Sequence, residues 1–281
     1  MTGVESALSA DWLGVCREVV AGIQTMLHEH PTTRERAVET GRGEGGDQSL
    51  VIDRAAEAIV FERLDDLHAQ GHRFTAISEE RGEVSFGDRG VLVVIDPIDG
   101  SMNAKRGLTH HAVSIAVADG ETMADVAFGF VYDFGAREEW TAWRGAGVRM
   151  NGAPPGPSSV ERRSGDGKLE LVAIESADPR WIAATAENLV PVAYRVRALG
   201  SIAIALCQVA CGRVDGFVTL WRCRAVDAAA GQLIVRESGG LAAFTAYDDP
   251  LAAPLDLEPH SSLVAARSPA ALEQLAQVPM R

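Results

Sequence analysis

An apolar run that ends in two closely spaced aspartates constrains this chain more than any other feature of its sequence. Residues 91–95 read VLVVI and are followed at once by DPIDGS. Five apolar, mostly β-branched residues in a row predict a buried strand. Pro97 is compatible with the first position of a helical turn, and such a turn would place Asp96 and Asp99 on one face.

Carboxylates this close repel each other and stay ionised together only when cations lie between them. Oxygen ligands suit Mg²⁺, which takes one or two carboxylates together with water and substrate phosphate. The N–H groups of Gly100, Ser101 and Met102 would be unpaired at the start of a helix, where an anion binds well. An ordinary turn is the alternative, since Asp-Pro and Asp-Gly pairs are common in turns, and the segment alone does not decide between the two.

Three further acidic positions stand at the ends of regular segments. Glu79 and Glu80 follow an apolar run, which taken alone is typical of a solvated loop. Asp227 begins a helix whose first turn is AAAG, and an Asp at a helix start is usually a cap. Four small residues in a row indicate, however, that this turn presses against another backbone and that Asp227 lies deep. Asp53 stands at the start of a further amphipathic segment.

Periodicity over the rest of the chain predicts an α+β protein with a largely antiparallel, meandering sheet. The segment 31–49 reads as a loop, and the Pro-, Gly- and Ser-rich stretch 151–168 is the best candidate boundary between an N-terminal half, 1–150, and a C-terminal half, 151–281. Helices are expected at 11–28 (after Ser9 as a candidate cap), 53–69, 179–189, 201–211 and 227–238, and strands at 74–77, 91–95, 111–118, 125–133, 137–143, 170–175 and 215–220.

Composition excludes several classes of protein. The 281 residues carry a formal net charge of −13, which disfavours non-specific binding to nucleic acids and anionic membranes. No apolar run is long enough to span a bilayer and no signal peptide is visible, so a cytoplasmic protein is expected. Cys207 and Cys211 share a helix face with no histidine beside them, and we interpret them, like Cys16 and Cys223, as structural.

Taken in order, the acidic segments resemble the inositol monophosphatase family, within the lithium-sensitive, Mg²⁺-dependent phosphatases. That pattern runs as a Glu-Glu pair, then D-P-[IL]-D-G-[ST]-x-N, then D-x-A-A-G before a helix that ends in Gly-Gly. Here these are Glu79–Glu80, Asp96–Asn103 and Asp227–Gly231. The resemblance covers about residues 42–245. The ordered set is much more specific than DPIDGS alone.

The resemblance implies a layered α-β-α-β-α sandwich and a phosphoric monoester hydrolase with two to three Mg²⁺ ions. Glu79, Asp96 and the carbonyl of Ile98 would hold the first ion, and Asp96, Asp99 and Asp227 the second; a third, weaker ion would share Glu79. Phosphate would bind to the N–H groups of Gly100 and Ser101, and Asp53 and Ser101 would help to activate the attacking water. No His or Cys is needed as a nucleophile, and His110 and His111 are interpreted as structural or surface residues.

Departures from the pattern concern the substrate. Val226 stands where many relatives have Trp, and Ala104 where many have an aromatic residue. Animal inositol monophosphatases carry a polyol-binding Glu on the strand before the last motif, whereas VTLWRCRAV at 218–226 has no acid. The DGS-x-N form of the first motif, the Val before Asp227 and the phrase LIVRESGG resemble archaeal-type enzymes, which hydrolyse both inositol phosphate and fructose 1,6-bisphosphate.

Four basic residues near the motifs, Lys105, Arg106, Arg222 and Arg224, either bind a second phosphate or are solvated loop charges, and the sequence favours neither. We expect the substrate-binding set to include Met102, Arg222 and Arg224 beside Asp99, Gly100, Ser101 and Asp227.

The expected partner is a small phosphorylated metabolite, with no nucleic acid and no membrane, and the expected assembly is a homodimer. Two alternative functions stay open: a 3'-phosphoadenosine 5'-phosphate phosphatase, which would need an aromatic residue to stack on adenine, and a family member that acts mainly as an interaction protein.

Overall fold

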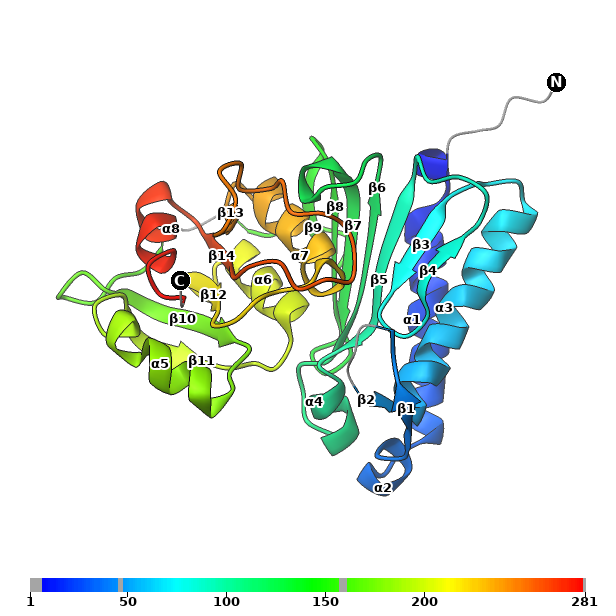
Figure 1. The fold of residues 1–281 in the computed structure, drawn as a ribbon, viewed down its shortest axis with the longest axis horizontal. Coiled ribbons are helices and arrows are strands. Elements are labelled where there is room, and N and C mark those ends of the chain that lie inside the picture. Colours follow the sequence, from blue (N-terminus) through cyan, green and yellow to red (C-terminus); the bar gives the residue numbers. More distant parts are fainter. Residues whose placement is uncertain (1–6, 45–47, 157–160, 280–281) are drawn as a thin grey trace.

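Five alternating layers of helices and sheets make up the fold (Figure 1). The structure is a computed structural model that describes residues 7–44, 48–156 and 161–279. Helices α1 (Trp12–Glu29) and α3 (Val51–Ala69) cover the outer face of a seven-stranded sheet. Helices α6 (Ile202–Ala210) and α7 (Ala225–Glu237) fill the space between this sheet and a five-stranded one, and α5 (Pro179–Leu189) and α8 (Pro269–Leu275) cover the far side. The predicted α-β-α-β-α sandwich is confirmed.

The first layer consists of α1 (Trp12–Glu29) and α3 (Val51–Ala69), close to their predicted bounds. Asp11, not Ser9, caps α1, since its carboxylate accepts the N–H of Gly14 at 3.0 Å. Both helices bury an apolar face against the large sheet.

The loop predicted at 31–49 is wrong in part. It contains a short helix, α2 (Thr33–Arg36), and the strands β1 (Glu39–Arg42) and β2 (Gln48–Leu50), which pair with each other. The helix forms because Thr32 and Glu35 satisfy each other's backbone N–H groups. A helix of one turn shows no apolar periodicity, so the pattern could not reveal it.

The large sheet is mainly the predicted antiparallel meander, in the order β4-β3-β5-β6-β7-β8-β9. Only β3 and β5 among these neighbours run parallel. The strands are β3 (Thr75–Ser78), β4 (Gly82–Ser85), β5 (Leu92–Asp99), β6 (Ala112–Ala118), β7 (Val126–Asp133), β8 (Glu138–Trp143) and β9 (Gly147–Met150).

The helical turn predicted at Pro97 is wrong. β5 continues through Asp99, with a register shift against β6 between Asp96 and Asp99, and the short helix α4 (Ser101–Arg106) starts only after Gly100. A bulged strand tolerates Pro97 at its irregular point. The positions of Asp96 and Asp99 relative to each other are therefore determined by a β-bulge and not by a helical turn.

The smaller sheet runs in the order β11-β10-β12-β14-β13, and the 3-10 turns η1 (Ala7–Ser9) and η2 (Met123–Asp125) complete the described elements. Its strands are β10 (Leu169–Glu175), β11 (Ala193–Arg197), β12 (Gly216–Thr219), β13 (Leu241–Phe244) and β14 (Leu263–Ala266); its helices are α5 (Pro179–Leu189), α6 (Ile202–Ala210), α7 (Ala225–Glu237) and α8 (Pro269–Leu275).

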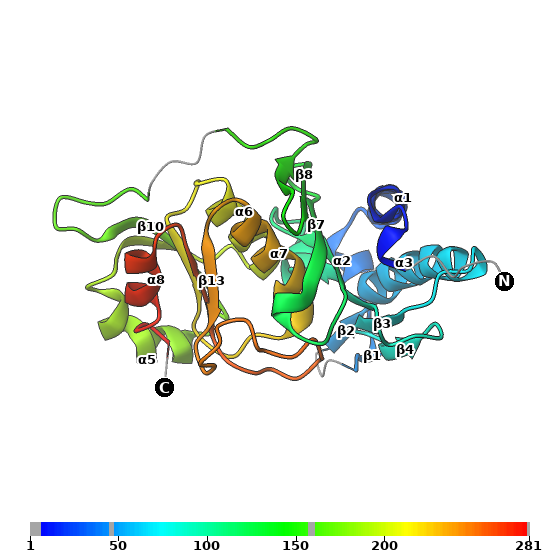
Figure 2. The same ribbon diagram turned by 90° about the horizontal axis from the view of Figure 1, so that it is seen from above.

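Helix α7 lies directly on the large sheet, as its small residues predict. A Cβ atom added at Gly129 of β7 would come within 2.9 Å of the carbonyl oxygen of Ala230. Viewed from above, α6 and α7 lie between the two sheets (Figure 2). One apolar core thus contains residues of both halves, and the division at residue 150 stays a prediction. No helix in the described ranges has the length and apolarity to cross a membrane.

Candidate active site

The acidic segments of the sequence meet at one edge of the large sheet. β3 and β5 are parallel neighbours, with Ser78 beside Ile95, so Glu79 and Asp96 leave the sheet at the same edge. Asp227 lies in the first turn of α7, which packs on β5. The negative charges of Glu79, Asp99 and Asp227 all raise the pKa of Asp96, which places the four carboxylates near one another.

Burial makes this cluster electrostatically costly. Asp96 is 2% exposed, and burial first, then the neighbouring carboxylates, raise its pKa well above the usual range. Its Oδ1 atom accepts the N–H of Ile98 at 3.0 Å. For Asp99, burial and the charge of Asp227 raise the pKa to about 7. A cation among these groups would remove much of this cost.

Asp99 also anchors the start of α6. Its Oδ2 atom accepts hydrogen bonds of 2.6 Å from the Ser201 hydroxyl and from the N–H of Ala203, and its Oδ1 atom accepts the N–H of Ile202 at 3.3 Å. The N-terminal end of a helix favours a negative charge. Asp99 therefore joins the edge of the large sheet to the central helices.

Arg224 provides a cation at the centre of the cluster. Its guanidinium lies 2.8 Å from Glu79 and 3.2 Å from Asp227, and its side chain is 16% exposed. The sequence predicts a substrate contact for this residue, whereas here it pairs with two of the predicted metal ligands.

The residues fit a divalent cation in chemistry but are not gathered as a ready-made cage. Within residues 7–44, 48–156 and 161–279, no three acidic, His or Cys side chains converge closely enough to enclose an ion. The donors are nevertheless largely buried carboxylate oxygens whose like charges repel one another, and they already attract a guanidinium. This is the donor set that Mg²⁺ prefers.

Asp53 lies near Ser101, the residue that follows Gly100 in the first motif. It is 5% exposed; Oδ2 accepts the N–H of Leu50 at 3.0 Å, while Oδ1 is buried without a hydrogen-bond partner in the described part of the chain. Burial raises its pKa to about 6, and the nearby Ser101 hydroxyl opposes the shift. That hydroxyl donates to the carbonyl of Ile98 at 2.9 Å, so Ser101 touches a predicted ligand.

Gly100 is required by the protein's own backbone. Its φ is +90°, and an added Cβ would lie 2.7 Å from the carbonyl oxygen of His110 and 2.9 Å from that of Gly200. Asn103 of the same motif donates to the carbonyls of His110 and Leu199. The motif therefore ties α4 to the segment before α6. The Asn103 N–H already donates to the Gly100 carbonyl at 2.8 Å, so the N–H groups that lack an acceptor within the helix are those before it.

A cavity of about 650 Å³ opens beside the cluster. Asp99 and Asp227 line its floor together with Arg222 and Arg224, while Met102 is 62% exposed on α4. Lys105 and Arg106 lie in the last turn of α4 and do not line this cavity. Of the four basic residues, Arg222 and Arg224 are therefore the two that line this cavity.

Two further residues line this cavity and do not belong to the predicted site. Glu175 ends β10, lines the cavity and accepts the N–H groups of Leu199 and Gly200 at 2.8 and 3.1 Å. Burial raises its pKa to about 8, against the effect of these N–H groups. Trp221 also lines the cavity and is 38% exposed. An acid that ends an apolar strand was the signal for Glu79, and the same signal would have indicated Glu175.

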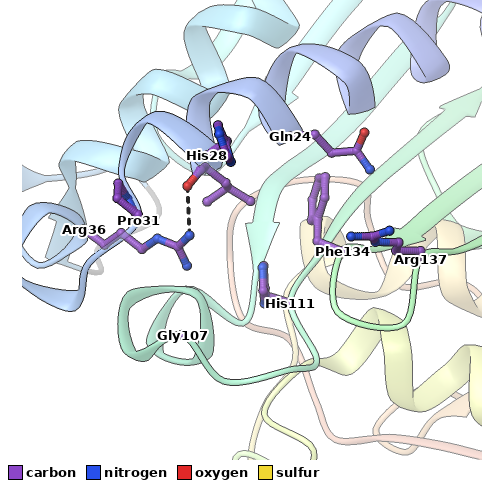
Figure 3. A pocket seen from close by; sticks show the side chains of 9 residues that line it. Gln24, His28, Pro31, Arg36, Gly107, His111, Phe134 and Arg137 are labelled. Atoms are coloured by element: carbon purple, nitrogen blue, oxygen red, sulfur yellow. Dashed lines mark hydrogen bonds between the residues drawn. The ribbon is translucent and has the colours of Figure 1, made fainter.

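A second cavity, of about 620 Å³, lies apart from these residues, between α1 and the turns that follow α4 and β7 (Figure 3). Arg36 bonds there to the carbonyls of Leu27, His30 and Ala104, and His111 is 7% exposed, with Nδ1 3.1 Å from the Leu108 carbonyl oxygen. These contacts connect α1, α2 and α4, in agreement with a structural interpretation of His111.

Comparison with known proteins agrees with this geometry. The model of the inositol monophosphatase family matches residues 11–278. Nus factor SuhB of Escherichia coli is 38% identical over 210 residues, which cover 73% of this chain and 74% of the relative. Fructose-1,6-bisphosphatase/inositol-1-monophosphatase of Archaeoglobus fulgidus is 30% identical over 233 residues, covering 82% and 83%.

The fold has a close counterpart among solved structures. A crystal structure described as an inositol monophosphatase–fructose 1,6-bisphosphatase superimposes with a TM-score of 0.79 at 23% identity, over 96% of this chain and 100% of that one. At this identity the likeness bears on the fold alone.

Proposed function

Because the chain belongs to the inositol monophosphatase family of phosphoric monoester hydrolases, we propose that it hydrolyses a small sugar or cyclitol phosphate with Mg²⁺. The observation that carries the proposal is the cluster of Glu79, Asp96, Asp99 and Asp227 beside a cavity of about 650 Å³. The family is generally Mg²⁺-dependent, and two to three ions are expected here.

Each carboxylate has a distinct task in this proposal. Glu79, Asp96 and the Ile98 carbonyl would hold one ion, and Asp96, Asp99 and Asp227 another, with a third ion sharing Glu79. Bound Mg²⁺ would supply Lewis-acid chemistry, neutralising phosphate charge and lowering the pKa of water. Arg224 would leave Glu79 and Asp227 when the ions bind, since both cations need the same oxygens.

The chain's own groups would position the phosphate and the attacking water. The N–H groups of Gly100, Ser101 and Met102 lie at the start of α4 and would donate hydrogen bonds to phosphate oxygens. Asp53 carries a buried oxygen without a partner in the described residues, and with a pKa of about 6 it would exchange a proton near neutral pH. The Ser101 hydroxyl would orient the same water.

The cavity favours a substrate with a second anionic group. Leu220 and Trp221 follow the strand before α7, so no acid stands there to bind polyol hydroxyls. Arg222, in contrast, lines the cavity. A guanidinium only donates hydrogen bonds and matches phosphate better than a hydroxyl. We therefore favour a bisphosphate such as fructose 1,6-bisphosphate over inositol 1-phosphate, in keeping with the name of the Archaeoglobus fulgidus relative.

The test is a phosphate-release screen of the purified chain with Mg²⁺ and with EDTA. Its substrates are inositol 1-phosphate, fructose 1,6-bisphosphate, histidinol phosphate and 3'-phosphoadenosine 5'-phosphate. Mg²⁺-dependent release from a sugar or cyclitol phosphate is expected, and it should be lost in Asp227→Asn but kept in Asp65→Asn, an exposed acid on α3. Release that EDTA does not stop would contradict the metal chemistry.

A role as an interaction protein is the second candidate, because several relatives carry the name Nus factor SuhB. The intact set of acids weighs against a purely non-catalytic role, since a scaffold has no need of them. No release from any of the four substrates, together with a stoichiometric complex formed with purified Nus factors of the same cell, would favour this candidate.

A further inference from the structure

Two tryptophans from distant parts of the chain stack at the edge of the candidate active site. Trp181 lies in the first turn of α5, and Trp221 lies in the segment between β12 and α7. Their ring centroids are 4.2 Å apart and their planes differ by 1°. Trp221 lines the cavity that Asp99 and Asp227 also line, so one member of the pair forms part of its wall.

An arginine covers each outer face of the pair. The guanidinium of Arg180 lies 5.5 Å from the Trp181 ring centroid, and that of Arg222 lies 5.7 Å from the Trp221 ring centroid. Asp178 holds Arg180 through two hydrogen bonds of 2.8 and 2.9 Å. The result is a four-member stack, Arg180–Trp181–Trp221–Arg222, of which Trp221 and Arg222 line the cavity.

Arg222 differs from the other arginines of the site. Arg224 pairs with Glu79 and Asp227, whereas Arg222 has no hydrogen bond or ion pair recorded in the described part of the chain. A cation–π contact holds a guanidinium by its face and leaves its N–H edges free to donate. In a chain of net charge −13, this leaves a positive group held by aromatic packing beside the cavity in which we propose that the phosphate ester binds.

We propose that Trp181 is a positioning residue for substrate specificity: through Trp221 it holds Arg222 at the cavity wall, where Arg222 binds a second anionic group on the leaving-group side of the substrate. The inference rests on the proposed phosphatase function. It also weighs against a substrate bound by base stacking, because each indole has one face on its partner and the other beneath a guanidinium.

The experiment is a double-mutant cycle of Trp181→Ala and Arg222→Ala, with KM and kcat measured for fructose 1,6-bisphosphate and for inositol 1-phosphate. Trp181→Ala should raise KM for the bisphosphate about threefold or more, because Trp221 without its stacking partner no longer keeps Arg222 in its cation–π contact, with kcat little changed. The rise for the monophosphate should be much smaller, and Trp181→Phe should restore most of the loss. In the Arg222→Ala background, Trp181→Ala should add no further change.

The control is Tyr194→Ala, which removes an exposed aromatic ring that lies 4.0 Å from the Arg195 guanidinium, away from the cavity. Equal rises in KM on both substrates, or additive effects of the two changes, would overturn the inference. If the wild-type chain hydrolyses neither substrate, the proposed function fails. The dissociation constant of the bisphosphate, measured by isothermal titration calorimetry, then decides the inference, and equal affinity of the wild-type and Trp181→Ala proteins would overturn it.

Discussion

Replacing Arg224 by Met should make the protein bind Mg²⁺ more tightly. The guanidinium contacts Glu79 at 2.8 Å and Asp227 at 3.2 Å, and all three side chains are at most 16% exposed. Solvent therefore screens these pairs less than surface pairs. A metal that needs the same oxygens must first displace the guanidinium.

The magnitude follows from the contact that Mg²⁺ has to break. One charge-assisted hydrogen bond contributes about 1.5–3 kcal/mol, and every 1.4 kcal/mol changes a dissociation constant about tenfold. We count only the Glu79 contact, because the longer Asp227 contacts of 3.2 and 3.3 Å contribute less. Arg224→Met should therefore lower the Mg²⁺ dissociation constant roughly tenfold or more.

Isothermal titration of EDTA-stripped protein with MgCl₂ measures this directly. Arg195→Met is the matched control, because Arg195 is exposed on β11 and contacts Tyr194. In EDTA the Arg224→Met protein should also melt at a lower temperature than wild type, since buried carboxylates lose their counter-charge. Mg²⁺ binding that is unchanged or weaker in Arg224→Met would refute the reasoning.

Three further predictions concern other parts of the molecule. Burial raises the pKa of Glu175 to about 8, so the metal-free protein should lose stability between pH 4.5 and 8, where the unfolded chain releases this proton and the folded chain keeps it; Glu175→Gln should flatten that loss in urea titrations, and an unchanged pH slope would count against it. Li⁺ should inhibit phosphate release by competing with Mg²⁺ at the second ion site, and complete indifference to Li⁺ with Mg²⁺ dependence intact would count against that site. Gly129→Ala should destabilise the fold by about 1–3 kcal/mol because its Cβ would meet Ala230, whereas a Cβ at Gly156 meets nothing within 4 Å and Gly156→Ala should have no such effect. Equal denaturant midpoints of the two variants would show that α7 moves to accommodate the added methyl group.

Long periodic elements and the acidic motifs were open to prediction from the sequence because their signals are local. The helix 11–28, the strand 91–95 and the small residues after Asp227 each express burial in the residues themselves. The meander followed from strand length and spacing, and the family pattern supplied the layer order.

What the sequence did not reveal depends on contacts between distant segments. Pro97 favoured a helical turn, but pairing of β5 with β6 extends the strand to Asp99. The stack of Trp181 on Trp221 joins residues forty positions apart, and no spacing rule relates them. Arg224 illustrates the same limit, because its identity suggested a phosphate contact while the surrounding carboxylates determine where its guanidinium lies.

The central claim is that carboxylates at the edge of the large sheet hold the ions that assist hydrolysis of a phosphate ester. This claim depends most on Asp96. The most direct measurement is Mg²⁺-dependent phosphate release by Asp96→Asn, beside wild type and Asp65→Asn, with folding checked by circular dichroism. The account predicts a loss of roughly a thousandfold or more, the several kcal/mol that metal stabilisation of the transition state supplies, in a folded protein. An Asp96→Asn protein that keeps wild-type turnover would contradict it.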